Sequence, residues 1–123
     1  SKDSSSPLLN TIKQKVNSKE TPKLTKDPLF YPNPFRIADG SYLFYELNRT
    51  NIEITLKIFD IRGHKIFSKN YSSSTTTPTE FGYYKVPFNA AILGTYNMPA
   101  GVYFFLLTYQ DEVLGKGKFA ILP

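Results

Sequence analysis

From residue 29 to the end of the chain, apolar and polar residues alternate in short runs that are typical of β-strands. The clearest run has an apolar residue at every second position: Ile52, Ile54, Leu56 and Ile58. Seven such runs follow one another: residues 31–37, 42–47, 52–58, 65–70, 81–88, 101–110 and 113–121. Seven short strands with almost no helix predict an all-β fold, a seven-stranded antiparallel β-sandwich of the immunoglobulin or fibronectin III type.

Two of these runs carry further detail. Residues 101–110 are apolar on both faces, which predicts a central strand that is covered on both sides. In residues 113–121, Gly115 and Gly117 predict a bulge or a close backbone approach. Turns are expected at Asp39-Gly40 and at Arg62-Gly63-His64.

The segment Tyr31-Pro32-Asn33-Pro34-Phe35 marks the beginning of the strand pattern. Its two prolines fix φ near −65° and remove two backbone donors, so the segment belongs at the edge of a sheet. An extended backbone would place Tyr31 and Phe35 on the same side, in the core. We therefore expect Tyr31→Ala and Phe35→Ala each to lower stability by about 3–5 kcal/mol. The prolines also predict that this edge rejects an added strand and that the opposite edge is left for a partner.

Residues 1–28 differ from the rest of the chain. They carry six lysines and three acidic residues, a net charge of +3, whereas the remainder has nine basic and seven acidic residues, a net charge of +2. We interpret residues 1–28 as a flexible linker or tail, with a short helix or a docking segment as alternatives, and residues 29–123 as the sandwich domain. Because most of the excess charge lies on the tail, nucleic-acid binding is not expected.

No group of residues indicates catalysis or a bound cofactor. The chain has no cysteine, and its one histidine, His64, lies in an expected turn without ligands at metal spacing. Asp111 and Glu112 are adjacent, which a turn explains better than a pair of catalytic carboxylates. We therefore expect a domain that is not an enzyme, with no catalytic, cofactor-binding or metal-binding residues. No apolar run approaches the ~20 residues of a membrane span, so membrane insertion is not expected either.

Five motifs, taken in order, resemble one known family. They are residues 31–35 (YPNPF), 43–47 (LFYEL), 56–63 (LKIFDIRG), 99–106 (PAGVYFFL) and 117–121 (GKFAI). In this order and spacing the chain resembles the Ig-like C-terminal domain of the flagellar hook-cap (FlgD-like) protein and the related C-terminal sorting domains of the type nine (Por) secretion system. The resemblance covers about residues 29–123. Its motif residues, which it implies to be structural, are Tyr31, Pro32, Asn33, Pro34, Phe35, Asp60, Gly63, Gly101 and Tyr103.

The resemblance implies a non-catalytic domain of an exported bacterial protein, outside the cytoplasm. As a secretion-sorting or cell-surface attachment module it would bind a translocon or an anchoring protein, and it would follow an upstream domain of the same parent chain. Removal by cleavage near residues 17–28 would fit that role. The alternative is a structural or adhesive module, retained in a hook-cap-like or surface assembly and bound to a neighbouring subunit.

Alternation also identifies a possible interaction surface. Tyr42, Phe44 and Phe59 fall on the outward side of their expected strands, where they would leave apolar area exposed. Such a surface fits a protein partner; the alternative is that the tail or a loop of the same chain covers it. Exposed Tyr and Phe side chains also fit a third hypothesis, a carbohydrate-binding accessory domain.

Overall fold

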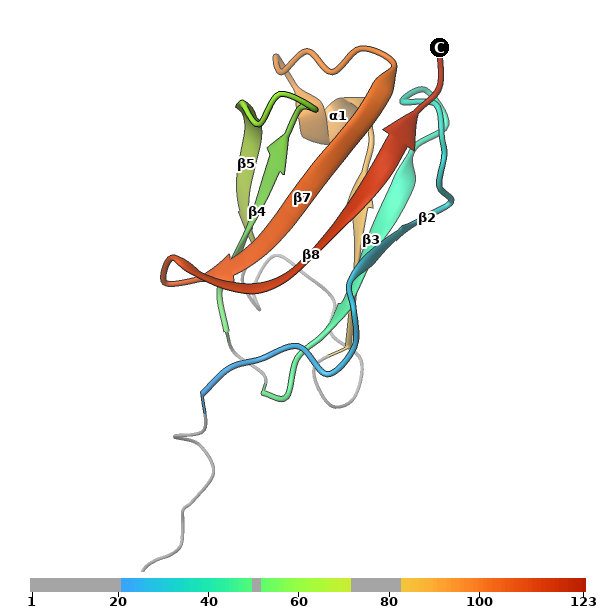
Figure 1. Ribbon diagram of the computed structural model, residues 1–123. Helices are drawn as coiled ribbons and strands as arrows, with labels where there is room; N and C mark the ends of the chain where they lie inside the picture. Colours follow the sequence, from blue (N-terminus) through green and yellow to red (C-terminus); the bar gives the residue numbers. More distant parts are fainter. Residues whose placement is uncertain (1–20, 50–51, 72–82) are drawn as a thin grey trace, which may run out of the picture.

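The computed structural model describes residues 21–49, 52–71 and 83–123, which form a β-sandwich (Figure 1). One sheet has the strand order β2-β3-β6 and the other the order β5-β4-β7-β8, and all neighbouring strands are antiparallel. The strands are β2 (Leu29–Tyr31), β3 (Ser41–Glu46), β4 (Ile54–Phe59), β5 (Lys65–Tyr71), β6 (Tyr83–Phe88), β7 (Gly101–Tyr109) and β8 (Glu112–Ile121). The predicted all-β sandwich is confirmed for the described residues.

The core forms where the alternation predicted it. The inward side chains of β3 and β4 include Leu43, Leu56 and Ile58, none of which is more than 1% exposed. Aromatic rings fill the centre: the ring of Phe30 lies 4.3 Å from that of Phe119 and 5.0 Å from that of Phe105, centroid to centroid. Buried rings of this size supply a large share of the apolar area that stabilises a small domain.

Strand β7 is central in its sheet, as predicted, but it is covered on one side only. Val102 and Phe104 point outward and each is 45% exposed. The prediction of a doubly covered strand is wrong, because no second layer packs on this face in the described residues. In β8 the predicted bulge is confirmed: the β7–β8 register shifts between Leu107, which pairs with Gly115, and Thr108, which pairs with Val113. Gly117 leaves room for a core ring, because a Cβ there would lie 2.6 Å from Cζ of Phe105.

The segment from Tyr31 to Phe35 carries the chain from one sheet to the other. Strand β2 ends at Tyr31, the chain bends through residues 32–34, and Phe35 then forms a parallel bridge with Ile121 at the edge of the second sheet. Phe35 is buried at 3% exposure, but Tyr31 is 68% exposed, so the prediction that both rings enter the core is wrong for Tyr31. The bends interrupt the alternation, and Phe30 takes the core position instead.

The side chain of Asn33 completes this crossing. Its Oδ1 accepts a hydrogen bond from the backbone N–H of Ala120 (3.0 Å), and its Nδ2 donates to the carbonyl oxygen of Lys118 (3.4 Å). Two residues later, the N–H of Phe35 donates a hydrogen bond to the carbonyl oxygen of Ala120, and the carbonyl oxygen of Phe35 accepts one from the N–H of Leu122. The amide of Asn33 therefore pairs with the edge of β8 as a backbone peptide group would.

Turns and one short helix connect the strands. Gly63 has φ +88° in the β4–β5 turn, and its N–H donates to the carbonyl of Asp60. Helix α1 (Ala90–Leu93) begins after Asn89, whose side chain accepts from the N–H of Ile92. At the start of β7, the hydroxyl of Tyr103 donates to the carbonyl of Pro99 at 2.5 Å. This hydrogen bond is the tyrosine corner that accompanies many immunoglobulin-like sandwiches.

Residues 21–28 also pack against the sandwich. Leu24 bridges Leu47 at the end of β3, and the N–H of Thr25 donates to the carbonyl of Glu46 at 2.9 Å. Pro22 and Pro28 are buried. The domain boundary predicted at residue 28 stays a prediction, and these contacts make it directly testable.

Alanine substitution of the two rings that flank the crossing should give opposite results. We expect Phe35→Ala to lower the free energy of unfolding by about 3–5 kcal/mol, because it empties a site in the aromatic core. Tyr31→Ala should lower it by less than about 1 kcal/mol, because the ring is solvent-exposed. Urea unfolding of both variants measures the difference, and equal losses would contradict the burial described here.

A chain that begins at Leu29 should be less stable than one that begins at Thr21. The shorter chain loses the buried Pro22 and Pro28, the packing of Leu24 and the hydrogen bond to Glu46, for which we expect about 1–3 kcal/mol. Thermal unfolding of the two chains side by side tests this, and equal stability would support the boundary at residue 28.

Candidate functional site

The outward aromatic residues picked from the sequence lie on two different surfaces. Tyr42 and Phe44 belong to β3 and face outward from the three-stranded sheet, whereas Phe59 belongs to β4 and faces outward from the other sheet. In a sandwich the outer faces of the two sheets lie on opposite sides. The structure therefore brings Tyr42 and Phe44 together and separates them from Phe59.

Neighbouring strands add further side chains to Tyr42 and Phe44. In register, Tyr31 of β2 lies opposite Tyr42, Leu29 lies opposite Phe44, and Tyr83 of β6 lies opposite Glu46. Tyr31, Leu29 and Tyr42 are 68%, 49% and 42% exposed. We call this surface the aromatic face; it comprises Leu29, Tyr31, Tyr42, Phe44 and Tyr83.

The rings of the aromatic face lie close together but at an angle to one another. Phe44 is 6.4 Å from Tyr42 at an interplanar angle of 55°, and 6.3 Å from Tyr83 at 37°. The ammonium of Lys85 lies 4.4 Å from the ring centre of Tyr42 and 5.9 Å from that of Phe44. This cation–π contact holds the lysine over part of the face.

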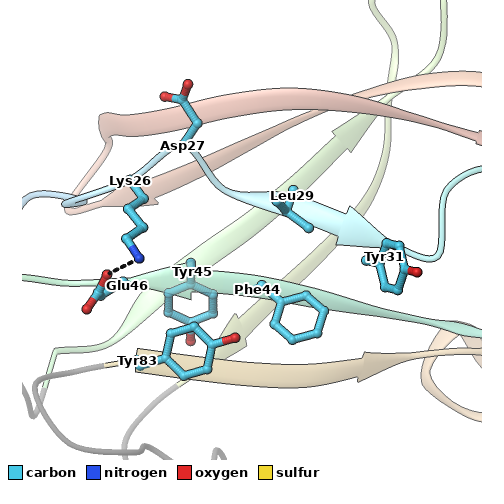
Figure 2. A pocket seen from close by; sticks show the side chains of 8 residues that line it. All are labelled: Lys26, Asp27, Leu29, Tyr31, Phe44, Tyr45, Glu46 and Tyr83. Atoms are coloured by element: carbon cyan, nitrogen blue, oxygen red, sulfur yellow. Dashed lines mark ion pairs between the residues drawn. The ribbon is translucent and has the colours of Figure 1, made fainter.

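A hollow of about 390 Å³ opens on the aromatic face (Figure 2). Leu29 and Tyr31 line one side, Tyr83 lines the other, and Phe44 lies between them. At one end Lys26 Nζ lies 3.7 Å from Glu46 Oε1, an ion pair between an exposed lysine and a partly buried glutamate, and Asp27 also lines this end. The hollow has the size and the apolar lining of a site for a partner's side chains.

Three buried tyrosines point into the core: Tyr45 of β3 and Tyr84 of β6 lie in the sheet that carries the hollow, and Tyr71 lies in β5 of the other sheet. Tyr45 and Tyr84 stack at 4.9 Å and 15°, and the hydroxyls of Tyr71 and Tyr84 have no hydrogen-bond partner in the described part of the chain. Burial raises the pKa of Tyr71 to about 12. Burial, followed by the neighbouring phenols of Tyr84 and Tyr71, raises the pKa of Tyr45 well above its usual value.

The sheet edges are poorly suited to accept another strand. Strand β2 has three residues and is followed by Pro32 and Pro34. The opposite edge of this sheet, which was expected to be open to a partner, is β6, and β6 contains Pro87. Asn33 and Phe35 occupy the end of the β8 edge. Edge strand β5 carries Lys69 opposite Leu56, on the core-facing side. Prolines and inward-pointing charges are the devices that keep edges from pairing.

The remaining motif residues have structural positions. Asp60 Oδ1 accepts hydrogen bonds from the N–H groups of Arg62 and His64, and Asp60 Oδ2 lies 3.7 Å from His64 Nδ1. The hydrogen bond from the His64 N–H is the largest effect and lowers the pKa of Asp60; desolvation opposes it, and the weaker effects of the Arg62 hydrogen bond and of the nearby charges lower the pKa further. Asp60 thus organises the β4–β5 turn together with Gly63.

The described ranges contain no group of three or more His, Cys, Asp or Glu side chains placed to hold a metal ion. They also contain no helix that is long and apolar enough to cross a membrane. Asp111 lies in the β7–β8 turn, 99% exposed and 3.9 Å from Lys57 Nζ, and Glu112 begins β8.

The sequence analysis missed three members of the aromatic face, Leu29, Tyr31 and Tyr83, and the contact of Lys85 with it. Leu29 and Tyr31 follow from the burial of Phe30, since neighbours of an inward residue in a strand point outward. Tyr83 and Lys85 reach the aromatic face only through the β3–β6 register, which joins residues about forty positions apart. No local pattern in the sequence reports that pairing.

The free energy of unfolding should fall in strong alkali, because the buried tyrosines ionise more readily in the unfolded chain than in the folded one. Their folded pKa values exceed the unfolded value near 10, so their contribution is complete below about pH 10 and is lost as the pH rises toward 12. Ultraviolet absorbance titration should resolve a late-ionising group of tyrosines. Tyr71→Phe should remove one of them without lowering stability at pH 7, because its hydroxyl is unpaired. Uniform titration near pH 10 would contradict this account.

No model of a known protein family matches this chain, and no curated protein matches it either. The resemblance to hook-cap and sorting domains therefore rests on the five motifs alone.

Proposed function

We propose that this chain is a non-catalytic β-sandwich domain of an exported bacterial protein, and that it serves as a sorting or cell-surface attachment module. A translocon or anchoring protein would recognise it through the aromatic face. The observation that carries the proposal is the exposure of Leu29, Tyr31 and Tyr42 side by side on one sheet, where Leu29 and Tyr31 also line a hollow. Sorting itself is suggested by the resemblance of the motifs.

Two physical features support recognition by a face and not by an edge. Contiguous exposed apolar side chains on a small domain mark contact sites, and Tyr is enriched at the centre of protein interfaces. The edges of both sheets carry prolines, an inward lysine or the Asn33 contact, so addition of a partner strand is disfavoured. A partner would therefore bind to the side chains of a sheet face and not to the backbone groups of a strand edge.

A retained structural or adhesive module is the alternative, and the same face would then contact a neighbouring subunit. The carbohydrate-binding hypothesis has less support. Rings at 37° and 55° do not form one plane for a flat polysaccharide, and Lys85 lies over Tyr42. Retention on polysaccharide that is lost in Tyr42→Ala/Phe44→Ala would favour it.

The test is export of a reporter fused to residues 21–123 in a host that has the Por machinery. We expect Tyr31→Ser/Tyr42→Ser to lower export at least about ten-fold, which corresponds to about 1.4 kcal/mol of binding. Ile61→Ser/Tyr96→Ser is the matched control, because these residues are 73% and 48% exposed but lie outside the aromatic face. Circular dichroism confirms that both variants fold.

The outcomes separate the parts of the proposal. Export that survives deletion of residues 29–123 would rule out sorting. If export needs the domain but tolerates Tyr31→Ser/Tyr42→Ser, the sorting role would stand and the aromatic face would be excluded as the recognition site. An intact mass of the mature parent that still includes the domain favours the retained structural module, whereas loss of the domain by cleavage favours sorting.

A further inference from the structure

The outer face of the four-stranded sheet carries lysines around an apolar centre. Two rows of directly opposed residues cross its four strands. The first row is Lys65, Phe59, Phe104 and Lys118. The second row is Ser68, Lys57, Leu106 and Lys116. With strands roughly 4.8 Å apart, the lysines of one row stand roughly 10–14 Å apart with apolar side chains between them.

This basic face, made of Lys57, Lys65, Lys116 and Lys118 around Phe59, Phe104 and Leu106, is open to solvent. Phe104 is 45% exposed, and so is Val102, the next outward residue of β7. Neither row contains a carboxylate. Asp111 of the β7–β8 turn is 99% exposed and lies 3.9 Å from Lys57 Nζ. An ion pair this long and this exposed is easily replaced by another carboxylate.

We propose that the basic face binds an acidic amphipathic segment of another protein. Carboxylates of that segment pair with the flanking lysines, and its apolar side chains pack on Phe104 and Leu106. Binding needs both the ion pairs and the apolar packing, because exposed ion pairs contribute little on their own and the apolar centre is small. The chemistry of the partner follows from complementarity to this face.

Three other occupants fit the face less well. A second copy would set lysines against lysines, and each opposed pair of like charges lowers affinity. A lipid surface would meet the ammonium groups first, because lysine side chains reach further from the sheet than Phe104 or Leu106, and the apolar centre would stay outside the acyl region. A nucleic acid would engage the lysines but leave the apolar centre unused.

The basic face is independent of the aromatic face. It lies on the other sheet, so the two surfaces can be occupied together, and failure of the sorting proposal leaves this inference untouched. The domain then resembles a connector: one face for the recognising protein and one for an acidic segment.

Binding of synthetic decapeptides to the full chain tests the inference by fluorescence anisotropy. The probe alternates Glu with Leu and has blocked ends; comparison peptides replace Leu by Ser or Glu by Lys. We expect the Glu–Leu peptide to bind tightest, and an increase in ionic strength from about 0.05 to about 0.5 M to weaken it roughly ten-fold, since screening shortens the reach of exposed charges. The variant Lys116→Glu/Lys118→Glu should weaken binding at least about ten-fold.

Lys23→Glu/Arg36→Glu is the matched control, because it makes the same change in net charge at exposed basic residues outside the basic face and the aromatic face. Its affinity should stay within about two-fold of the wild type. Equal losses in both variants, equal binding of the Glu–Ser peptide, or no binding of the Glu–Leu peptide would each overturn the proposal. Tighter binding to phosphatidylglycerol vesicles or to oligothymidylate would overturn it in favour of a membrane or a nucleic acid.

Discussion

The sandwich depends on how the chain crosses from one sheet to the other between Phe30 and Phe35. Phe30 packs on Phe105 and Phe119, and five residues later Phe35 enters the same core beside Phe119, at 5.8 Å between ring centres. Between them the chain must leave the edge of one sheet and join the edge of the other. Asn33 makes the crossing possible, because its side-chain amide pairs with Lys118 and Ala120 where the bent backbone cannot.

The crossing also explains which parts of the fold the sequence could predict. Within one strand, alternation gives the buried side correctly, as it does for Leu43 in β3 and for Ile58 in β4. Alternation does not continue through a change of sheet, so it placed Tyr31 in the core when Phe30 belongs there. Apolar side chains on both faces of β7 gave another wrong inference, because Phe104 has the same sequence pattern whether or not a layer covers it.

The surfaces were predictable only in part for a related reason. A sequence with period two shows that Tyr42, Phe44 and Phe59 point outward, but it does not show from which sheet. That assignment depends on strand order, and strand order depends on contacts between distant residues. The two rows of the basic face are an example, because each row brings together residues from four strands. Lys65 and Lys118 belong to the same row although they are far apart in the sequence.

The protected strand edges allow the sheet faces to remain exposed without self-association. A domain that displays apolar side chains risks association with copies of itself, and unpaired strand edges are the usual route. Here Pro87, the inward Lys69 and the Asn33 contact restrict that route. The lysines around Phe104 add repulsion between like faces. Exposed aromatic and apolar groups can then persist on both sheets, and a partner has to match their charges and shapes in order to bind.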